Sequence, residues 1–206
     1  MVLGSVLVFL ALGLYLYNDH EQKQAAEAVD QLMPQLVDVI RERQDNPPEA
    51  TAPPEATEPV EEVTQPVVTL PQQKVMPVVE IDGNPYIGFV SIPSLELELP
   101  VMDDWNYKKL KKTPCRFTGD MYSDDLVVMA HNYVRHFGPI RRLRAGDTVT
   151  FTDMDGVTTE YAVVAVDVLK PTAVEEMIAG EYDLTLFTCT YGGKTRVTVR
   201  CDRVTD

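Results

Sequence analysis

The sequence predicts a mainly β protein: a closed barrel of seven or eight strands with short helices, preceded by an N-terminal membrane anchor and a proline-rich stalk. Three observations lead to this prediction. From about Glu80 onward, short runs rich in β-branched and aromatic residues alternate with turn residues. Helical periodicity is confined there to the short segments 107–112, 139–143 and 173–178. Before Glu80, an uncharged apolar run and a proline-dense segment replace this pattern.

The composition fits one domain of ordinary size with additional segments. The chain has 206 residues, of which 45% are hydrophobic and 24% charged, and its net charge is −14. We expect no nucleic-acid partner, because phosphate recognition needs a basic surface. The chain has three cysteines, without a CxxC spacing, and three histidines. These numbers exclude a disulfide-dense miniprotein and a histidine-rich metal centre, and we expect neither a metal nor a cofactor.

Residues 1–18 are predicted to form a transmembrane anchor. The run 2–17 carries no charge and would form about 24 Å of helix, slightly less than the ~30 Å hydrocarbon core of a bilayer. A signal peptide is the main alternative, but the basic n-region and the small-x-small cleavage site are missing; a buried helix is the other. We therefore expect a single-pass protein of the cell membrane.

Residues 19–45 are predicted to form an amphipathic helix, kinked at Pro34. The apolar side chains that recur every three or four residues in it are Ala26, Val29, Leu32, Leu36, Val39 and Ile40. Residues 46–79 follow as a Pro/Glu-rich linker. With eight prolines between 46 and 77, this segment favours an extended polyproline conformation and cannot form a packed core. We expect it to hold the remaining domain away from the membrane.

Residues 80–206 make up the predicted folded domain. The strands are expected at 86–92, 97–102, 126–130, 148–152, 159–168, 184–189 and 195–201. Asp-Met-Asp-Gly at 153–156 favours a hairpin between two of them. Because closure removes exposed strand edges, so many short strands favour a barrel. We also expect residues 80–206 to be soluble and active without residues 1–79.

The segment 184–200 contains the most informative residues. It places Cys189 at the end of an apolar strand, followed by a short Gly-rich loop and by Arg196 at the start of the next strand. If the two strands pair, Arg196 lies beside Cys189, where its permanent charge suits a carbonyl oxygen or an oxyanion. A thiolate at a strand end is an accessible nucleophile. Taken alone, Cys189 also fits a small buried hydrophobic residue.

His131 directly follows the predicted strand 126–130, which makes it a candidate general acid or base. A structural histidine is the alternative. His136 competes for the role but lies in a loop, with no strand to fix it. Arg200 is an alternative to Arg196, since residues four apart on a strand share a face. We prefer Arg196 because it directly follows the loop after Cys189.

Together these residues resemble the sortases, the membrane-anchored cysteine transpeptidases of Gram-positive bacteria. The resemblance rests on TLFTC with an arginine seven residues later, on AHN about sixty residues upstream, and on HFGPIRRLRAGDTVTF, and it covers 86–204. Matched by motif, Cys189 corresponds to the family's nucleophile, His131 to its histidine and Arg196 to its arginine. Ala130 replaces the glycine that precedes the family's histidine. The YIGFVSIPSLELELPVM and TCTYGG segments and the helix-like N-terminal extension look most like class B, and class D is the alternative.

The resemblance implies a two-step transpeptidation outside the cell. The Cys189 thiolate would attack a Thr–Gly or similar bond in an LPxTG- or NPxTN-type sorting signal of a secreted protein. A thioacyl enzyme would form, and His131 would protonate the leaving amine. An amine of a peptidoglycan precursor or of a pilin would then resolve the thioacyl group. Thr188 is expected to support substrate binding beside Cys189.

A non-catalytic, membrane-tethered β-barrel interaction module is the alternative interpretation. In such a module, Cys115 and Cys201 would form a disulfide and Cys189 would belong to the core. An L,D-transpeptidase is a less suitable alternative, because its cysteine would lie within a Ser-His-Gly-Cys stretch, which this sequence does not contain.

Overall fold

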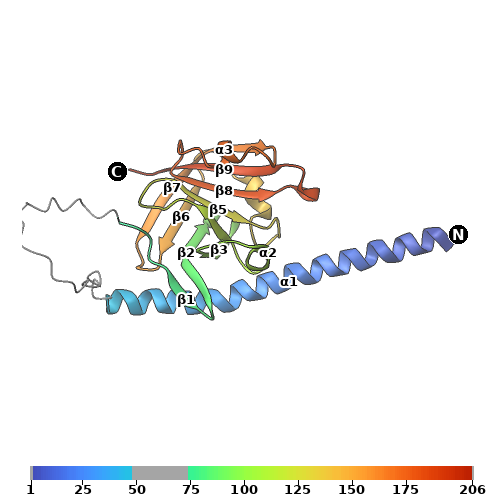
Figure 1. The fold of residues 1–206 in the computed structure, drawn as a ribbon, viewed down its shortest axis with the longest axis horizontal. Helices are drawn as coiled ribbons and strands as arrows, with labels where there is room; N and C mark the ends of the chain where they lie inside the picture. The colour runs from blue at the N-terminus through green and yellow to red at the C-terminus, as the bar shows by residue number, and fades with distance from the viewer. Residues whose placement is uncertain (1, 48–73, 206) are drawn as a thin grey trace, which may run out of the picture.

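The computed structural model describes residues 2–47 and 74–205. Most of the predicted linker, residues 48–73, lies outside the described residues. Figure 1 shows a barrel of strands with one long helix, α1 (Val2–Asp45), which runs beside the barrel and projects beyond it toward the N-terminus.

Eight strands close the barrel, which confirms the predicted architecture. Along the sheet the order is β1-β2-β3-β4-β5-β8-β9-β7-β6, and β6 pairs back onto β2. The pairs β3–β4 and β5–β8 are parallel and all others are antiparallel. β1 pairs with the first residues of β2 and lies outside the closed ring. The strands are β1 (Val79–Ile81), β2 (Asn84–Ile92), β3 (Leu97–Met102), β4 (Cys115–Thr118), β5 (Leu126–Ala130), β6 (Thr148–Asp153), β7 (Thr158–Leu169), β8 (Leu184–Cys189) and β9 (Arg196–Arg203).

The barrel closes where β2 meets β6, and Gly88 makes this approach possible. A Cβ atom at Gly88 would lie 1.9 Å from the carbonyl oxygen of Thr152, and the φ angle of +142° is one that other residues rarely adopt. Inside the ring, large side chains are fully buried and form one continuous core. They include Ile87, Leu99, Leu126, Phe137, Phe151, Tyr161, Leu186 and Val199.

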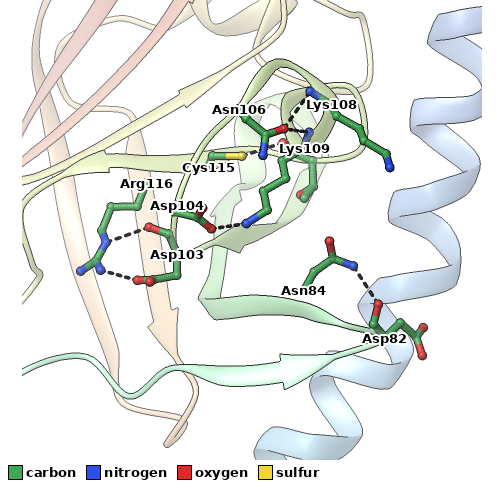
Figure 2. Close-up of polar contacts among 10 residues, drawn as sticks. Asp82, Asn84, Asp103, Asp104, Asn106, Lys108, Lys109, Cys115 and Arg116 are labelled. Carbon is green, nitrogen blue, oxygen red and sulfur yellow. Dashed lines mark hydrogen bonds and ion pairs between the residues drawn. The ribbon is translucent and has the colours of Figure 1, made fainter.

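Short helices occupy the connections, as the sequence predicts. They are η1 (Pro93–Leu95), α2 (Tyr107–Leu110), η2 (Gly138–Arg142), α3 (Val174–Met177) and η3 (Tyr191–Gly193). Figure 2 shows how polar contacts fix the loop between β3 and α2. Asp103 pairs with Arg116 of β4, and Asp104 pairs with Lys109. Asn106 caps α2 by accepting hydrogen bonds from the backbone amides of residues 108 and 109.

The second half of α1 packs against the barrel, which corrects the expectation of a separate N-terminal region. The helix is uninterrupted at Pro34 and lies beside β3. Val29 joins the barrel core, and Leu36 and Ile40 join a second cluster beneath the helix. Burial of these side chains removes apolar surface from water on both partners. Removal of α1 would expose the barrel surface beneath these side chains, and the expectation that residues 80–206 suffice for a soluble, active domain stays a prediction.

Ion pairs fix α1 at several points along its contact with the barrel. Glu21 pairs with Lys111 at 2.7 Å, near the start of the contact. Asp30 pairs with Arg135 at 2.6 Å. At the end of the helix, Arg43 pairs with Asp155 at 2.6 Å. The linker therefore does not separate this helix from the barrel.

The described residues of the predicted anchor, 2–18, belong to the projecting part of α1 (Figure 1). Its described large apolar side chains are exposed; they include Leu7, Val8, Phe9, Leu10, Leu14 and Leu16. The apolar stretch is short, because Asn18 and Asp19 follow it directly. Among the described residues no helix combines the length and the hydropathy that crossing a bilayer requires, so the predicted transmembrane anchor is not supported.

Candidate active site

The ends of three neighbouring strands bring together the residues that the sequence singles out. β8 lies between β5 and β9. Cys189, the last residue of β8, is directly opposite Arg196, the first residue of β9. Ala130 of β5 is opposite Thr188, so His131 follows at the level of Cys189. Since neighbouring strands lie about 5 Å apart, His131, Cys189 and Arg196 form a row at one edge of the sheet.

Cys189 differs from the other two cysteines in its exposure. It is half-buried, whereas Cys115 and Cys201 are fully buried. Burial raises the pKa of both Cys115 and Cys201 to about 12, so their thiols stay protonated. All three cysteines are free, so the disulfide expected for a non-catalytic module is absent.

The loop between Cys189 and Arg196 is held closed by two threonines. The amide of Thr190 donates to the carbonyl oxygen of Thr195 at 3.0 Å, and their hydroxyl groups are 2.9 Å apart. Gly192 and Gly193 turn the chain with φ angles of +77° and +70°, which favour glycine. This tight loop sets the register that places Arg196 opposite Cys189.

Arg196 and Arg200 have different surroundings. Arg196 is half-buried, and its guanidinium donates to the carbonyl oxygens of Gly193 and Thr195 at 3.1 and 3.2 Å. It therefore lies over the loop that follows Cys189.

Arg200 is only 3% exposed and its guanidinium is committed to the protein interior. It donates to the carbonyl oxygens of Glu176 and Met177, at 2.5 and 3.0 Å, and to the Thr185 hydroxyl at 3.1 Å. Its Nε also lies 3.7 Å from an Asp167 carboxylate oxygen. Arg200 thus ties β9 to the connection that carries α3, and it has no free donor face for a substrate comparable to that of Arg196.

His131 is half-buried, and its ring stacks on Tyr133 with centroids 4.8 Å apart. Burial lowers the pKa of His131, and the Lys111 cation lowers it further, while Glu21 acts in the opposite direction. The ring is therefore mainly neutral at neutral pH. His136 is fully buried, and burial lowers its pKa to about 4. Because His136 is closed off from solvent, it does not compete with His131 for contact with a substrate.

A pocket of about 440 Å³ opens beside Cys189. Its walls come from the end of β8, the loop after it, the loop after His131, and η2. The lining residues are Asn132, Val134, Gly138, Pro139, Arg141, Arg142, Thr188, Cys189, Thr190, Tyr191 and Val197. In the described part of the chain, no group of three or more His, Cys, Asp or Glu side chains is placed to hold a metal ion.

Thr188 lines the pocket but is itself only 3% exposed. Its hydroxyl donates to the carbonyl oxygen of Ala130 at 2.8 Å. Thr188 therefore joins the strand that carries Cys189 to the strand that ends before His131. This contact fixes the relative height of those two residues.

An apolar strip near Cys189 shares no residue with this pocket. Leu169 of β7 is opposite Arg196, in the same row as Cys189. Phe187 packs with Val127 and Met177 on the outer face of the sheet. Exposed Val174 and Ile178 lie beside Met177 in the chain, at α3, whereas Val168 pairs with Val197 and points to the other face of β7 from Leu169.

The lining residues Asn132, Arg141, Arg142 and Tyr191 are not singled out by the sequence, nor is the apolar strip. Arg141 and Arg142 lie within the GPIRR segment of a motif used for the resemblance, which was the available indication for them. Their place at the pocket depends on how η2 packs beneath the end of β9, a long-range contact.

A closed barrel that presents a partly accessible cysteine between a histidine and an arginine defines the class of cysteine-dependent acyl-transfer enzymes. The sequence profile of the sortase domain matches residues 90–204, more than half of the chain. The chain belongs to the sortase family, whose members are cysteine transpeptidases.

Solved sortase structures share this fold. Sortase C1 from Streptococcus agalactiae is 28% identical with a TM-score of 0.53; the match covers 62% of this chain and 72% of that chain. Sortase C1 from Streptococcus suis is 28% identical with a TM-score of 0.51, over 59% and 74%. Sortase A from Corynebacterium diphtheriae is 24% identical with a TM-score of 0.52; the match covers 60% of this chain and 62% of that chain. At this identity the match supports a common fold and nothing further. A comparison with curated protein sequences gave no match. The matched structures named here are sortases A and C, so the expected likeness to class B is not confirmed.

Proposed function

We propose that this sortase cleaves a sorting signal near the C-terminus of secreted proteins and joins them, through a thioacyl enzyme on Cys189, to an amine. The observation that carries the proposal is the row of His131, Cys189 and Arg196 at the ends of three paired strands. Cys189 is the accessible thiol of the three and faces a pocket of about 440 Å³. The acceptors would be a peptidoglycan precursor or a pilin.

In the first step, the Cys189 thiolate attacks the carbonyl carbon of the scissile bond. The oxyanion that forms needs a donor, and the Arg196 guanidinium is the cation opposite Cys189. The C–N bond then breaks, and the His131 imidazolium gives its proton to the leaving amine. Since burial lowers the pKa of His131, the imidazolium is a minor form at neutral pH but a correspondingly strong acid.

In the second step, the roles of the ionisable groups reverse. A neutral amine attacks the thioacyl carbon, and neutral His131 takes up the proton that the amine loses. The C–S bond breaks, a new amide forms, and Cys189 leaves as a thiolate. Splitting one difficult acyl transfer into two easier steps is the general advantage of covalent catalysis.

The apolar strip supports an apolar sorting signal of the LPxTG or NPxTN type. A peptide laid along Leu169 of β7 and the exposed apolar residues at α3 would cover surface that is otherwise in contact with water. Its scissile bond would then lie at the level of Cys189 and Arg196, since Leu169 shares their row.

A location at the cell membrane, with the barrel outside, belongs to the same proposal. The exposed apolar side chains at the start of α1, such as Phe9 and Leu14 at 72% and 65% exposure, support it.

The test is peptide cleavage by the full chain and its Cys189→Ala variant. A panel of fluorogenic peptides with LPxTG- and NPxTN-type motifs should be cleaved by the native protein, and a new amide should form when an amine is added. Cys189→Ala should abolish both reactions. Cys115→Ala is the matched control, because its thiol is buried, and it should retain substantial cleavage. Turnover by a folded Cys189→Ala variant would refute the role of this residue.

A further inference from the structure

The pocket beside Cys189 has a cationic wall without a compensating acid. Arg141 and Arg142 of η2 both line it, and no carboxylate of residues 2–47 or 74–205 does. Both arginines are exposed, and within the described part of the chain neither forms an ion pair or hydrogen bond. Six other arginines of this acidic chain do pair with an aspartate: Arg41, Arg43, Arg116, Arg135, Arg200 and Arg203. Two adjacent unpaired guanidiniums at the reactive cysteine are therefore a distinct chemical feature.

The pocket and the apolar strip near Cys189 are formed by different residues. The strip comes from β7, α3 and the outer face of β8, and none of its residues lines the pocket. A transpeptidase must bring two substrates to the same carbon atom, and the acceptor arrives while the acyl chain still occupies its own site. Given the proposed function, on which this inference rests, the apolar side suits the sorting signal and the pocket is left for the acceptor.

We infer that Arg141 and Arg142 form a subsite for a carboxylate that the acceptor carries close to its nucleophilic amine. An acceptor whose charge is an ammonium alone would be repelled by two guanidiniums. A carboxylate on the same molecule reverses this balance, because guanidinium groups bind carboxylates with directed hydrogen bonds. The preferred acceptor is therefore an amino acid or peptide with a free carboxylate within a few bonds of the amine.

The same cations also favour the chemical form of the amine that reacts. Nearby positive charge lowers the pKa of an ammonium group and so increases its neutral fraction. The neutral nitrogen attacks the thioacyl carbon, its proton passes to His131, the C–S bond breaks and the Cys189 thiolate leaves. No further reactant is needed.

Glycylglycine and glycylglycine amide are the probes, because they present the same nucleophile and differ in the carboxylate. Transpeptidation of a fluorogenic sorting peptide by the full chain is measured with each acceptor. We expect kcat/KM to favour glycylglycine by roughly threefold to tenfold, the range for hydrogen-bonded charges at a partly exposed site. In Arg141→Gln/Arg142→Gln this ratio should fall to about one, and Arg141→Lys/Arg142→Lys should retain part of it. Arg144→Gln, an exposed arginine outside the lining, should keep the full ratio.

The outcomes separate the inference from the proposed function. If no sorting peptide is cleaved even without an acceptor, the proposed function fails. If cleavage proceeds but both acceptors react equally well, or the ratio survives in the double Gln variant, the inference is wrong and the function stands. If the double variant instead changes KM for sorting peptides with an acidic rather than a neutral variable residue, the pocket binds the donor peptide, which also overturns the inference.

Discussion

Arg196 and Arg200 carry the same charge on the same face of β9, and their surroundings assign them different tasks. The Arg196 side chain bonds only to carbonyl oxygens of its own loop, next to Cys189 in the strand pairing. Arg200 is enclosed and bonds to three groups on other segments. A free donor face beside Cys189 belongs to Arg196 alone of the two.

Replacing these two arginines should therefore give different phenotypes. Arg196→Ala should reduce kcat for a sorting peptide by ~10²–10³, the typical loss for one oxyanion donor. Arg196→Lys should also lose most activity, because Lys lacks the planar fork. Arg200→Ala should lower the free energy of unfolding by roughly 3–5 kcal/mol. The kcat of the folded variant should stay within about tenfold of the native value. Steady-state kinetics combined with urea unfolding separate the two effects, and a reversed pattern would assign the substrate role to Arg200.

The protonation of His131 should respond to a change at Lys111. The Lys111 cation lowers the pKa of His131 and also pairs with Glu21, which acts in the opposite direction. Lys111→Gln removes the cation and leaves Glu21 unpaired, so the pKa of His131 should rise. NMR titration of the His131 ring measures this, and the limb of the pH–rate profile that belongs to His131 should move to higher pH.

Lys108→Gln is the matched control, since Lys108 is an exposed lysine of α2, three residues before Lys111, and does not act on His131. It should leave the titration unchanged. A downward shift in Lys111→Gln would mean that another group sets the pKa of His131.

At the residue scale, the sequence predicts Cys189, His131 and Arg196 because each directly ends, follows or begins an apolar strand. Two strand pairings then bring the three residues together: β8 with β9, and β8 with the parallel strand β5. Arg141 and Arg142 are not predicted, because their place depends on long-range packing of η2. Periodicity contains no information on such contacts.

At the scale of the element, α1 is held by one stripe of buried side chains. The stripe consists of Ala25, Val29, Leu36 and Ile40, which recur at helical spacing. The predicted stripe named Val29, Leu36 and Ile40 correctly but placed Ala26 where Ala25 is buried. The sequence did not predict that this stripe packs against the barrel. The proline-dense linker suggested that helix and barrel are separate, and composition does not show whether the chain folds back after a linker.

Leu36→Ala should reveal how much this contact contributes. Leu36 is fully buried between α1 and the barrel, so the variant should lower the free energy of unfolding by roughly 2–5 kcal/mol. Leu16→Ala is the control on the same helix, because Leu16 is 56% exposed, and it should change stability by about 0.5 kcal/mol or less. Urea unfolding of the full chain measures both. Equal stability of Leu36→Ala and the native protein would mean that α1 is not seated in solution.

Two strands of the barrel region were missed by the sequence pattern. β1 has three residues and β4 has four, too few for alternation of apolar and polar residues to become visible. β4 nevertheless completes the ring, since it pairs with β3 through a single residue pair and with β5. The closed ring was predictable because exposed edges are unfavourable, whereas its shortest member was not.

At the scale of the whole molecule, buried His136 should make the fold sensitive to acid. Its pKa is about 4 in the folded state, against an ordinary value of about 6.5. Between these values the unfolded chain binds the proton and the folded chain does not, so the free energy of unfolding falls as the pH falls. The contribution reaches about 3 kcal/mol at pH 4, and the lowered pKa of His131 adds in the same direction.

His136→Gln should flatten this dependence between pH 6.5 and 4. Urea unfolding at several pH values gives the slope for the variant and for the native chain. His20→Gln, which replaces an exposed histidine of α1, should keep the native slope. Identical slopes in all three proteins would show that His136 does not couple protonation to folding.

Because α1 packs against the barrel, it also fixes the distance and the direction from the first turns of the helix to the row of His131, Cys189 and Arg196. The helix of 44 residues is about 66 Å long, and the part before Ala25 extends beyond the buried stripe by roughly 35 Å. The helix therefore sets the distance from its first turns to Cys189. Changing the number of residues between 48 and 73 would not alter this distance. One residue inserted before Glu21 would instead add about 1.5 Å and turn the catalytic edge by about 100° around the helix axis relative to the first turns. A four-residue insertion, close to one full turn, would lengthen this distance and nearly restore the original rotation around the helix axis.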